Sequence, residues 1–399
     1  MVPRFVITGS DDSQLRAITQ LALQSTLLFT AIVAVAASDV ASAQGAQNAF
    51  NLGANRRRYA AVASTLHSQT STMLPEIIKQ YQDQAVAPHQ WDDVVATHIV
   101  LALGDIGSGR PAQWLAHIHD ARSLLLQPAI TTNPTLMGRF LIEVFVNHEV
   151  ASVSAWEPPK RRASSVNFSV SDSLINDMGH HLNPGISAVF GTSARLLSLI
   201  HQTTRLARQY EAMVQRSNPS DNDYGWVSNE RHAIEAQLVQ LYQYPTTDMG
   251  AQALSQVFEA KRLAAIVYLF ARVDVEYFNL RHDIPAEIAP PESPKVYADK
   301  FRQVKQVSCA VLDIVAQISE PTPALIWPLF VIGVVSADSD DLRWGILYQL
   351  DRIGGSRHSA QVERVIHILE RVWNETDLDA GSGRWSEILV GKGPPPSLT

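Results

Sequence analysis

Apolar residues recur every three or four positions along most of this chain, which is the spacing of one face of an α-helix. A clear example begins at Tyr59 and ends at Ile78, and a denser apolar set lies between Asp92 and Gly104. The strict alternation that is typical of strands is scarce. The pattern predicts an all-α protein, a single large irregular helical bundle of roughly 12–16 helices.

Helices are expected wherever this spacing is sustained between breaks rich in glycine, proline or asparagine. The expected helical segments are residues 14–43, 59–78, 92–104, 114–125, 137–155, 187–215, 230–242, 251–279, 308–318, 326–335, 339–354 and 361–373. A polar and mobile segment is expected at 218–225, and a proline-rich linker at 288–294.

The most apolar stretch is Ile326–Val335, in which Trp327 carries the only strong hydrogen-bonding side chain. A helix needs about 20 residues to span a bilayer, and this run is too short, so a buried core helix is expected. Pro328 suits its first turn, and Gly333 would let another backbone come close. Ser339 is positioned to cap the helix that follows.

This region also carries a family resemblance. Trp327, Pro328, Phe330 and Gly333, followed after an acidic turn by Arg343, resemble a segment of the fungal-specific transcription factor regulatory domain, in its second, acriflavine-sensitivity-control-like family. The resemblance implies that these five residues are structural elements of that domain.

A second segment carries the same resemblance. After a glycine-rich break, Trp114, His117 and Arg122 follow one another as in a helix pair of this family. Further similarities continue in the family's order, so the resemblance implies one regulatory domain over residues 14–390. It is preceded by an N-terminal segment, residues 1–13, and followed by a tail, residues 391–399, that is expected to be disordered.

The composition is that of a globular protein, with 46% hydrophobic and 18% charged residues in 399. The net charge of −7 argues against a generalised nucleic-acid-binding surface, which is normally basic. Cys309 is the single cysteine, which excludes an intramolecular disulfide and any cysteine-based zinc site within the chain.

The single cysteine conflicts with one property of the family. Its members usually carry a binuclear zinc cluster that six cysteines hold and that reads DNA, and Cys309 alone cannot build one. Either the gene model starts downstream of such a cluster, or the protein is a relative without a cluster that acts through a partner. No direct nucleic-acid binding is expected from the chain as given.

The N-terminal region has some features of a secretory signal. Leu27–Ala37 is apolar apart from Thr30, and Ala41-Ser42-Ala43 resembles a cleavage site. The apolar run nevertheless starts too far from Met1 for an ordinary signal peptide, and aspartates precede it. A buried helix is therefore favoured over secretion, and no membrane association is expected.

Several fragments resemble catalytic motifs, and each lacks the residue that the chemistry needs. His148-Glu149 begins a zinc-protease motif, but Ser152 stands where the second histidine ligand belongs. Gly191 begins a nucleophile elbow, but Arg195 replaces its second glycine. We predict no enzyme, no catalytic residue and no cofactor.

The histidine pairs are weak candidates for metal ligands. His117-x-His119 and His180-His181 have no third ligand spaced to complete a site, so no metal site is predicted. His117 and Arg122 form either a polar clamp between helices or a plain helix surface, and the sequence does not choose.

A basic triplet lies in the clearest surface loop. Lys160, Arg161 and Arg162 follow two prolines and resemble a short nuclear-import signal. The same residues would also direct phosphorylation of Ser164. Import is the basis for predicting a nuclear location.

The resemblance implies a fungal transcription regulator whose regulatory domain responds to an effector, in a secondary-metabolite or drug-response gene set. Expected partners are proteins of the transcription machinery, a DNA-binding partner and a small-molecule effector. The alternative is a cytoplasmic accessory or small-molecule-binding helical protein. If a ligand binds, helix-lined apolar pockets near Trp114, Phe145, Tyr268 or Trp327 are the places expected for it, although aromatic residues at helical spacing more often belong to the core.

Overall fold

The computed structural model confirms the all-α prediction. It describes residues 13–43, 52–84, 86–108, 110–127, 130, 134–155, 175, 185–187, 189–214, 221–241, 251–273, 294–336, 338–356, 359–378 and 398. These ranges contain 13 α-helices and two short 3₁₀ turns, and they form no sheet. The expected number of helices is met within the described part of the chain.

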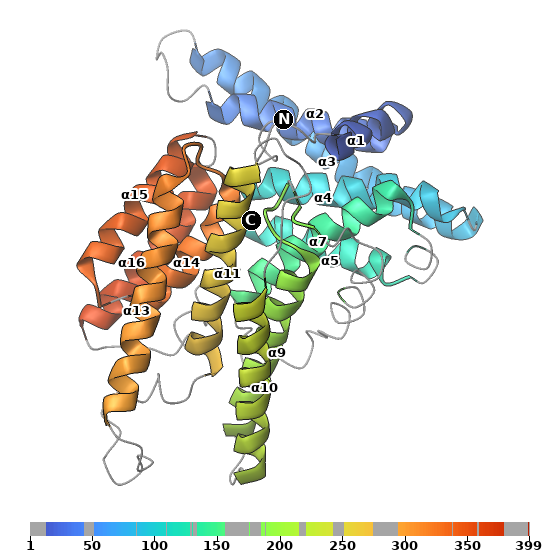
Figure 1. Ribbon diagram of the computed structural model, residues 1–399. Helices are drawn as coiled ribbons and strands as arrows, with labels where there is room; N and C mark the ends of the chain where they lie inside the picture. The colour runs from blue at the N-terminus through green and yellow to red at the C-terminus, as the bar shows by residue number, and fades with distance from the viewer. Residues whose placement is uncertain are drawn as a thin grey trace.

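Two sets of helices meet in the bundle (Figure 1). The N-terminal set lies across one end of the molecule and comprises α1 (Ser13–Gln24), α2 (Thr26–Ala43), α3 (Leu52–Gln84), α4 (Asp92–Gly107), α5 (Pro111–Leu125) and α7 (Leu136–Ser154). The second set comprises α9 (Ala194–Val214), α10 (Asp221–Gln240), α11 (Ala251–Val273), α13 (Pro294–Gln317), α14 (Ile326–Val335), α15 (Asp340–Ser356) and α16 (Ser359–Asp377). Contacts of α7 with α9 and of α4 with α16 join the two sets.

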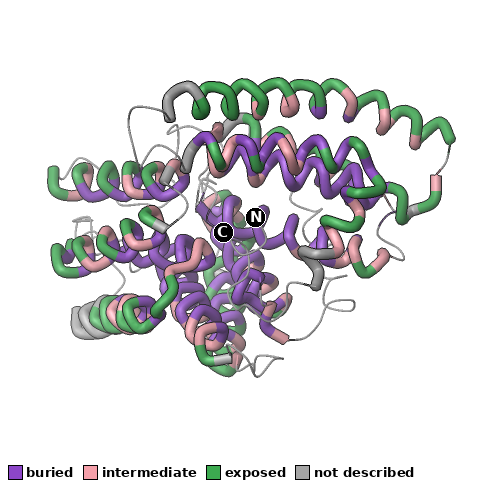
Figure 2. The backbone as a smooth tube through the Cα atoms, turned by 90° about the horizontal axis from the view of Figure 1, so that it is seen from above, coloured by how far each residue is buried: buried purple, intermediate pink, exposed green. Residues whose placement is uncertain are grey.

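The layers differ in how far they are buried. Nearly all of α4 is buried, whereas α3 turns most of its residues to solvent. Figure 2 shows α3 as a long, mostly exposed helix at the rim, beside the buried helices of the N-terminal set. Within the N-terminal set, α2 and α4 thus pack against each other, and α3 covers the outer side of α2.

The helix α14 is the centre of the second set, as its apolar sequence predicts. All ten of its residues are buried, and it contacts α11, α13, α15 and α16. The indole N–H of Trp327 donates to Ser154 Oγ at 2.8 Å, and the Tyr268 hydroxyl donates to the Ser154 carbonyl at 3.2 Å. These bonds satisfy the polar atoms of two buried aromatic side chains and join α14 and α11 to α7.

Gly333 and Arg343 connect α14, α15 and α16. The Gly333 carbonyl accepts a hydrogen bond of 2.9 Å from the Trp373 indole. A Cβ atom at Gly333 would lie 2.9 Å from a methyl carbon of Leu369, so a larger residue here would require the Leu369 side chain to shift. The Arg343 guanidinium lies over the Trp373 ring and donates to both carboxylate oxygens of Asp377.

The expected helix at residues 14–43 is wrong in one respect, because it is broken at Ser25. The Ser25 hydroxyl accepts a hydrogen bond from the Leu28 amide, which is N-cap geometry, and donates to Asp93 Oδ2 at 2.7 Å. A contact with a residue 68 positions away therefore decides where α2 begins.

The expected helix at residues 187–215 starts too early. Gly191 has a φ of 59°, which a continuous right-handed helix does not allow. The Ser193 hydroxyl then accepts from the Leu196 amide at 3.2 Å and caps α9. Residues 189–193 consequently form a turn in front of this helix.

Other boundaries also differ from the expectation. Asp221–Gly225 belongs to α10 instead of a mobile segment, and α13 begins at Pro294, 14 residues before the expected 308. The linker residues 288–293 and the first 12 residues of the N-terminal segment lie outside the described residues. So does the tail 391–399, except for Leu398, which is buried.

Among the described residues, none of the helices combines the length and the apolar character that a membrane crossing requires.

Replacing Trp327 with alanine is expected to lower the free energy of unfolding by about 3 to 5 kcal/mol. The physical reason is the loss of a buried indole together with its hydrogen bond to Ser154. Denaturant unfolding measures the change. Trp344, which is 74% exposed, provides the control, and its alanine variant should differ by less than about 0.5 kcal/mol. An unchanged midpoint for Trp327→Ala would contradict the central position of α14.

Candidate functional site

The candidate site is organised around Asp105, a carboxylate in the last turns of α4 that has no exposed surface. The sequence places it there because the preceding turns of α4 are apolar and draw the helix into the core. A buried carboxylate is costly unless a cation or several hydrogen bonds compensate it. The groups around Asp105 therefore determine what the site can do.

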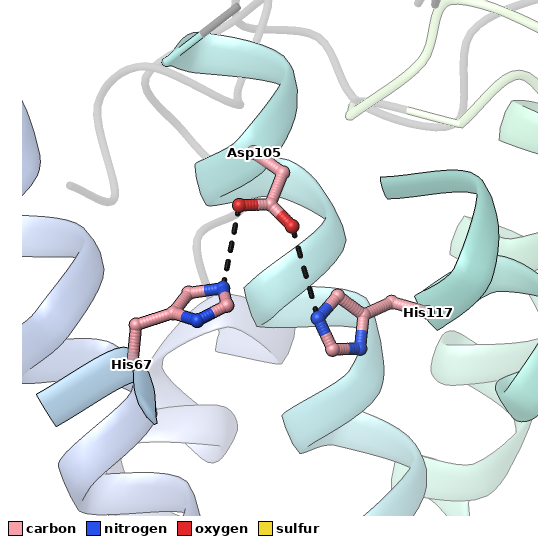
Figure 3. A group of neighbouring side chains, drawn as sticks. All are labelled: His67, Asp105 and His117. Atoms are coloured by element: carbon pink, nitrogen blue, oxygen red, sulfur yellow. Dashed lines mark ion pairs between the residues drawn. The ribbon is translucent and has the colours of Figure 1, made fainter. Parts of the chain in front are cut away.

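Three side chains surround the Asp105 carboxylate. Arg110 Nη2 lies 2.8 Å and His67 Nε2 lies 3.3 Å from Oδ1, while His117 Nε2 lies 3.7 Å from Oδ2. The two imidazoles approach from opposite sides, one from α3 and one from α5 (Figure 3). Neither carboxylate oxygen accepts a hydrogen bond of good geometry within the described part of the chain.

A third histidine extends the cluster. His98 precedes Asp105 by two turns on the same face of α4, and its Nδ1 lies 3.4 Å from His117 Nδ1. Burial, together with the neighbouring His117, lowers the pKa of His98 to about 3. Burial also lowers the pKa of His117, against the opposite effect of the Asp105 charge. Both imidazoles are therefore neutral near pH 7 and retain a lone pair for a proton or a cation.

A cavity of about 260 Å³ opens beside this cluster, between α2, α3 and the end of α4. Its basic groups are Arg56, His67 and Arg110, and its lining residues include no carboxylate. The remaining walls are small or hydroxylated side chains, among them Ala34, Ser38, Ala60, Ala63, Ser64 and Ser108. Such a cavity suits a small anionic molecule, because two arginines and several hydroxyl groups line it.

A second, apolar cavity of about 130 Å³ lies between α1, α2, α4, α7 and the turn before α9. Phe190 and His148 form part of its wall. Beneath them, the buried Lys261 ammonium donates to the Phe190 carbonyl at 2.7 Å. Burial lowers the pKa of Lys261 to about 7, and burial together with the Lys261 charge lowers the pKa of His148 to about 4.

The structure places the residues of the two segments that carry the family resemblance in different parts of the bundle. His117 joins the Asp105 cluster, and Arg122 Nε lies 3.3 Å from Glu149 Oε1, between α5 and α7. Trp114 is buried in the core. Trp327, Pro328, Phe330, Gly333 and Arg343 lie on α14 and α15 instead.

Two further expectations about the site have different outcomes. The import candidate Lys160, Arg161 and Arg162 lies outside the described residues. The four aromatic residues expected near apolar pockets are buried, and neither cavity is lined by any of them: Trp114, Phe145, Tyr268 and Trp327.

Sequence reasoning did not find His67, His98 and Asp105. The spacing of His98 and Asp105, seven positions apart on one helix, was a signal that they share a face. His67 gave no such signal, because its approach to Asp105 depends on how α3 lies against α4.

The family model of the fungal specific transcription factor domain matches residues 3–399. No curated protein and no solved structure matches the chain.

The lowered pKa of Lys261 predicts a pH-dependent stability. In the unfolded chain the lysine pKa is 10.5, and in the folded protein it is about 7, so below pH 7 both states hold the proton. Between these values only the unfolded state stays protonated, and stability should rise with pH by up to about 1.4 kcal/mol per pH unit. Denaturant unfolding of wild type and Lys261→Met across this range tests the effect.

The methionine variant should lack this rise, because it carries no proton to release. Lys305→Met, at an exposed position of α13, is the control and should keep the rise. Equal pH profiles for wild type and Lys261→Met would contradict the buried, deprotonating lysine.

Proposed function

The chain belongs to the family of fungal specific transcription factor domains, and from this membership we propose that it controls gene expression as the effector-responsive regulatory domain of a transcription regulator. The observation that carries the proposal is the extent of the family match, from residue 3 to residue 399. A match over nearly the whole chain supports a role for the entire helical bundle and not for one small part of it.

We propose that another element performs the DNA reading. The net charge is −7, and a single cysteine cannot hold a cluster that needs six thiolates. The domain would then act on a zinc-cluster DNA reader or on a DNA-binding partner, and on proteins of the transcription machinery. In this proposal the domain works in the nucleus on secondary-metabolite or drug-response genes.

The cavity beside Asp105 supports the effector response. Its volume of about 260 Å³ is near the lower end of the range for ligand pockets and suits a small metabolite. Arg56 and Arg110 would bind a carboxylate or phosphate of such a molecule. Because α3 forms one wall and the more deeply buried α2 and α4 form the others, an effector would couple a rim helix to the bundle.

A reporter assay tests the regulatory role. The chain, fused to a DNA-binding domain whose operator lies upstream of a reporter gene, should change transcription several-fold relative to the DNA-binding domain alone. Ala63→Leu, which places a larger side chain in the cavity wall, should reduce that change. Ala61→Leu, at an exposed position of the same helix, should not.

The two parts of the proposal fail separately. A folded wild-type fusion that leaves the reporter at the level of the DNA-binding domain alone would contradict the regulatory role. A wild-type response that Ala63→Leu leaves unchanged would contradict only the effector cavity.

The nuclear location has its own test. Changing Lys160, Arg161 and Arg162 together to alanine should move a fluorescent fusion from the nucleus to the cytoplasm, because the change removes the basic import signal. Changing the exposed triplet Arg56-Arg57-Arg58 in the same way removes equal charge and should leave the fusion nuclear. A variant with Lys160, Arg161 and Arg162 changed to alanine that remains wholly nuclear would refute the import signal.

A further inference from the structure

We infer that His67, Asp105 and His117 form a binding site for a divalent transition-metal ion, for which Zn²⁺ is the best probe. The ligand atoms of these three residues all lie within 4.8 Å of one another. They come from three different helices, α3, α4 and α5, which converge at the end of α4 (Figure 3). Two imidazole nitrogens and one carboxylate oxygen are a donor set that zinc accepts, with a fourth position open to water.

The distances are close to those of a bound ion. In a four-coordinate zinc site with bonds of about 2.0 to 2.2 Å, neighbouring ligand atoms lie about 3.3 to 3.5 Å apart. His67 Nε2 and Asp105 Oδ1 are 3.3 Å apart, and His117 Nε2 and Asp105 Oδ2 are 3.7 Å apart. The two imidazoles face different oxygens of the same carboxylate, and because the three donor atoms lie within 4.8 Å of one another, they would move closer together to share one ion.

The donors are buried polar atoms whose hydrogen bonding is incomplete. Both carboxylate oxygens of Asp105 and the Nε2 atom of His67 are buried, and none has a hydrogen bond of good geometry within the described residues. Buried polar groups are normally satisfied, so each of these atoms calls for an explanation. A cation bound by the three side chains would satisfy His67 Nε2 and one of the Asp105 oxygens.

Arg110 is the competitor for this position. Its Nη2 lies 2.8 Å from Asp105 Oδ1 and already supplies a positive charge. The Arg110 side chain is 37% exposed, it follows the end of α4, and it also lines the adjoining cavity. Its guanidinium can therefore turn into the cavity when a metal ion takes over the neutralisation of Asp105, so the metal and the arginine bind in competition.

His98 supports His117 as a ligand. When the metal occupies Nε2 of His117, the proton of that imidazole is on Nδ1, which lies 3.4 Å from His98 Nδ1. His98 then accepts this hydrogen bond and fixes both the tautomer and the orientation of the ligand, as second-layer partners do in metal sites. His98, His117 and Asp120 form an alternative trio, but Asp120 is exposed, so the ion would be held less completely by the protein.

Zinc titration of the purified, chelator-treated full chain tests the inference, with a competing zinc indicator as the readout. We expect one tight zinc ion per chain. Asp105→Asn and His67→Gln should each weaken binding by at least about tenfold. Asp120→Asn is the matched control, since it removes a carboxylate from the same region without touching the proposed ligands, and it should bind as wild type does.

Arg110→Gln gives a result of opposite sign. If arginine and metal compete for Asp105, this variant should bind zinc more tightly than wild type. A cluster that serves only the packing of the bundle would give no such gain. The visible absorption of bound Co²⁺ should at the same time show tetrahedral nitrogen and oxygen coordination in the wild type, and His67→Gln should lose it.

The inference would be overturned if the wild type bound no stoichiometric zinc, or if His67→Gln bound zinc as the wild type does. It would also be overturned if only Asp120→Asn lost binding, because that result would assign the ion to His98, His117 and Asp120. If Asp105→Asn does not fold, His67→Gln decides, because His67 is on the rim helix and its loss leaves the core intact. The measurement does not depend on transcription, so it stands apart from the regulatory role.

Discussion

The structure depends on covering a helix that is apolar on every side. Because all ten residues of α14 are buried, α11, α13, α15 and α16 must surround it, and none of them can be removed without exposing it to water. The single strong donor of this helix, the Trp327 indole, then fixes its position relative to α7 through Ser154. Gly333 serves the same end, since its lack of a side chain admits Leu369 and its carbonyl receives Trp373.

The N-terminal set is positioned by polar contacts of a different kind. Its central helix, α4, carries buried acidic groups near both ends, and each selects a neighbour: Asp93 binds Ser25 before α2, Asp92 binds Thr135 before α7, and Asp105 lies among groups from α3 and α5. Apolar contacts alone are not directional, so these pairs specify which helices pack on α4 and at which position along its length. The candidate site is thus part of the contacts that place α3 and α5.

The sequence predicted those features that depend on local pattern. The helix at 326–335, its burial and the all-α class follow from the apolar spacing, and two motif segments led to the family. Features that depend on contacts between distant residues were missed or misplaced. The break at Ser25 needs Asp93, the late start of α9 needs the positive φ of Gly191, and the cluster needs His67 to meet Asp105 across two helices. Spacing within one helix carries no information about the register between two.

The exposure of α3 has a consequence for kinetics. This helix runs for 33 residues at the rim, with its inner face on α2 and α4 and most of its surface in water, so it can detach locally while the rest of the bundle stays folded. One wall of the larger cavity belongs to it. The residence time of any molecule held there would then depend on how often α3 opens locally. The rate of release would therefore rise with temperature together with the rate of this opening.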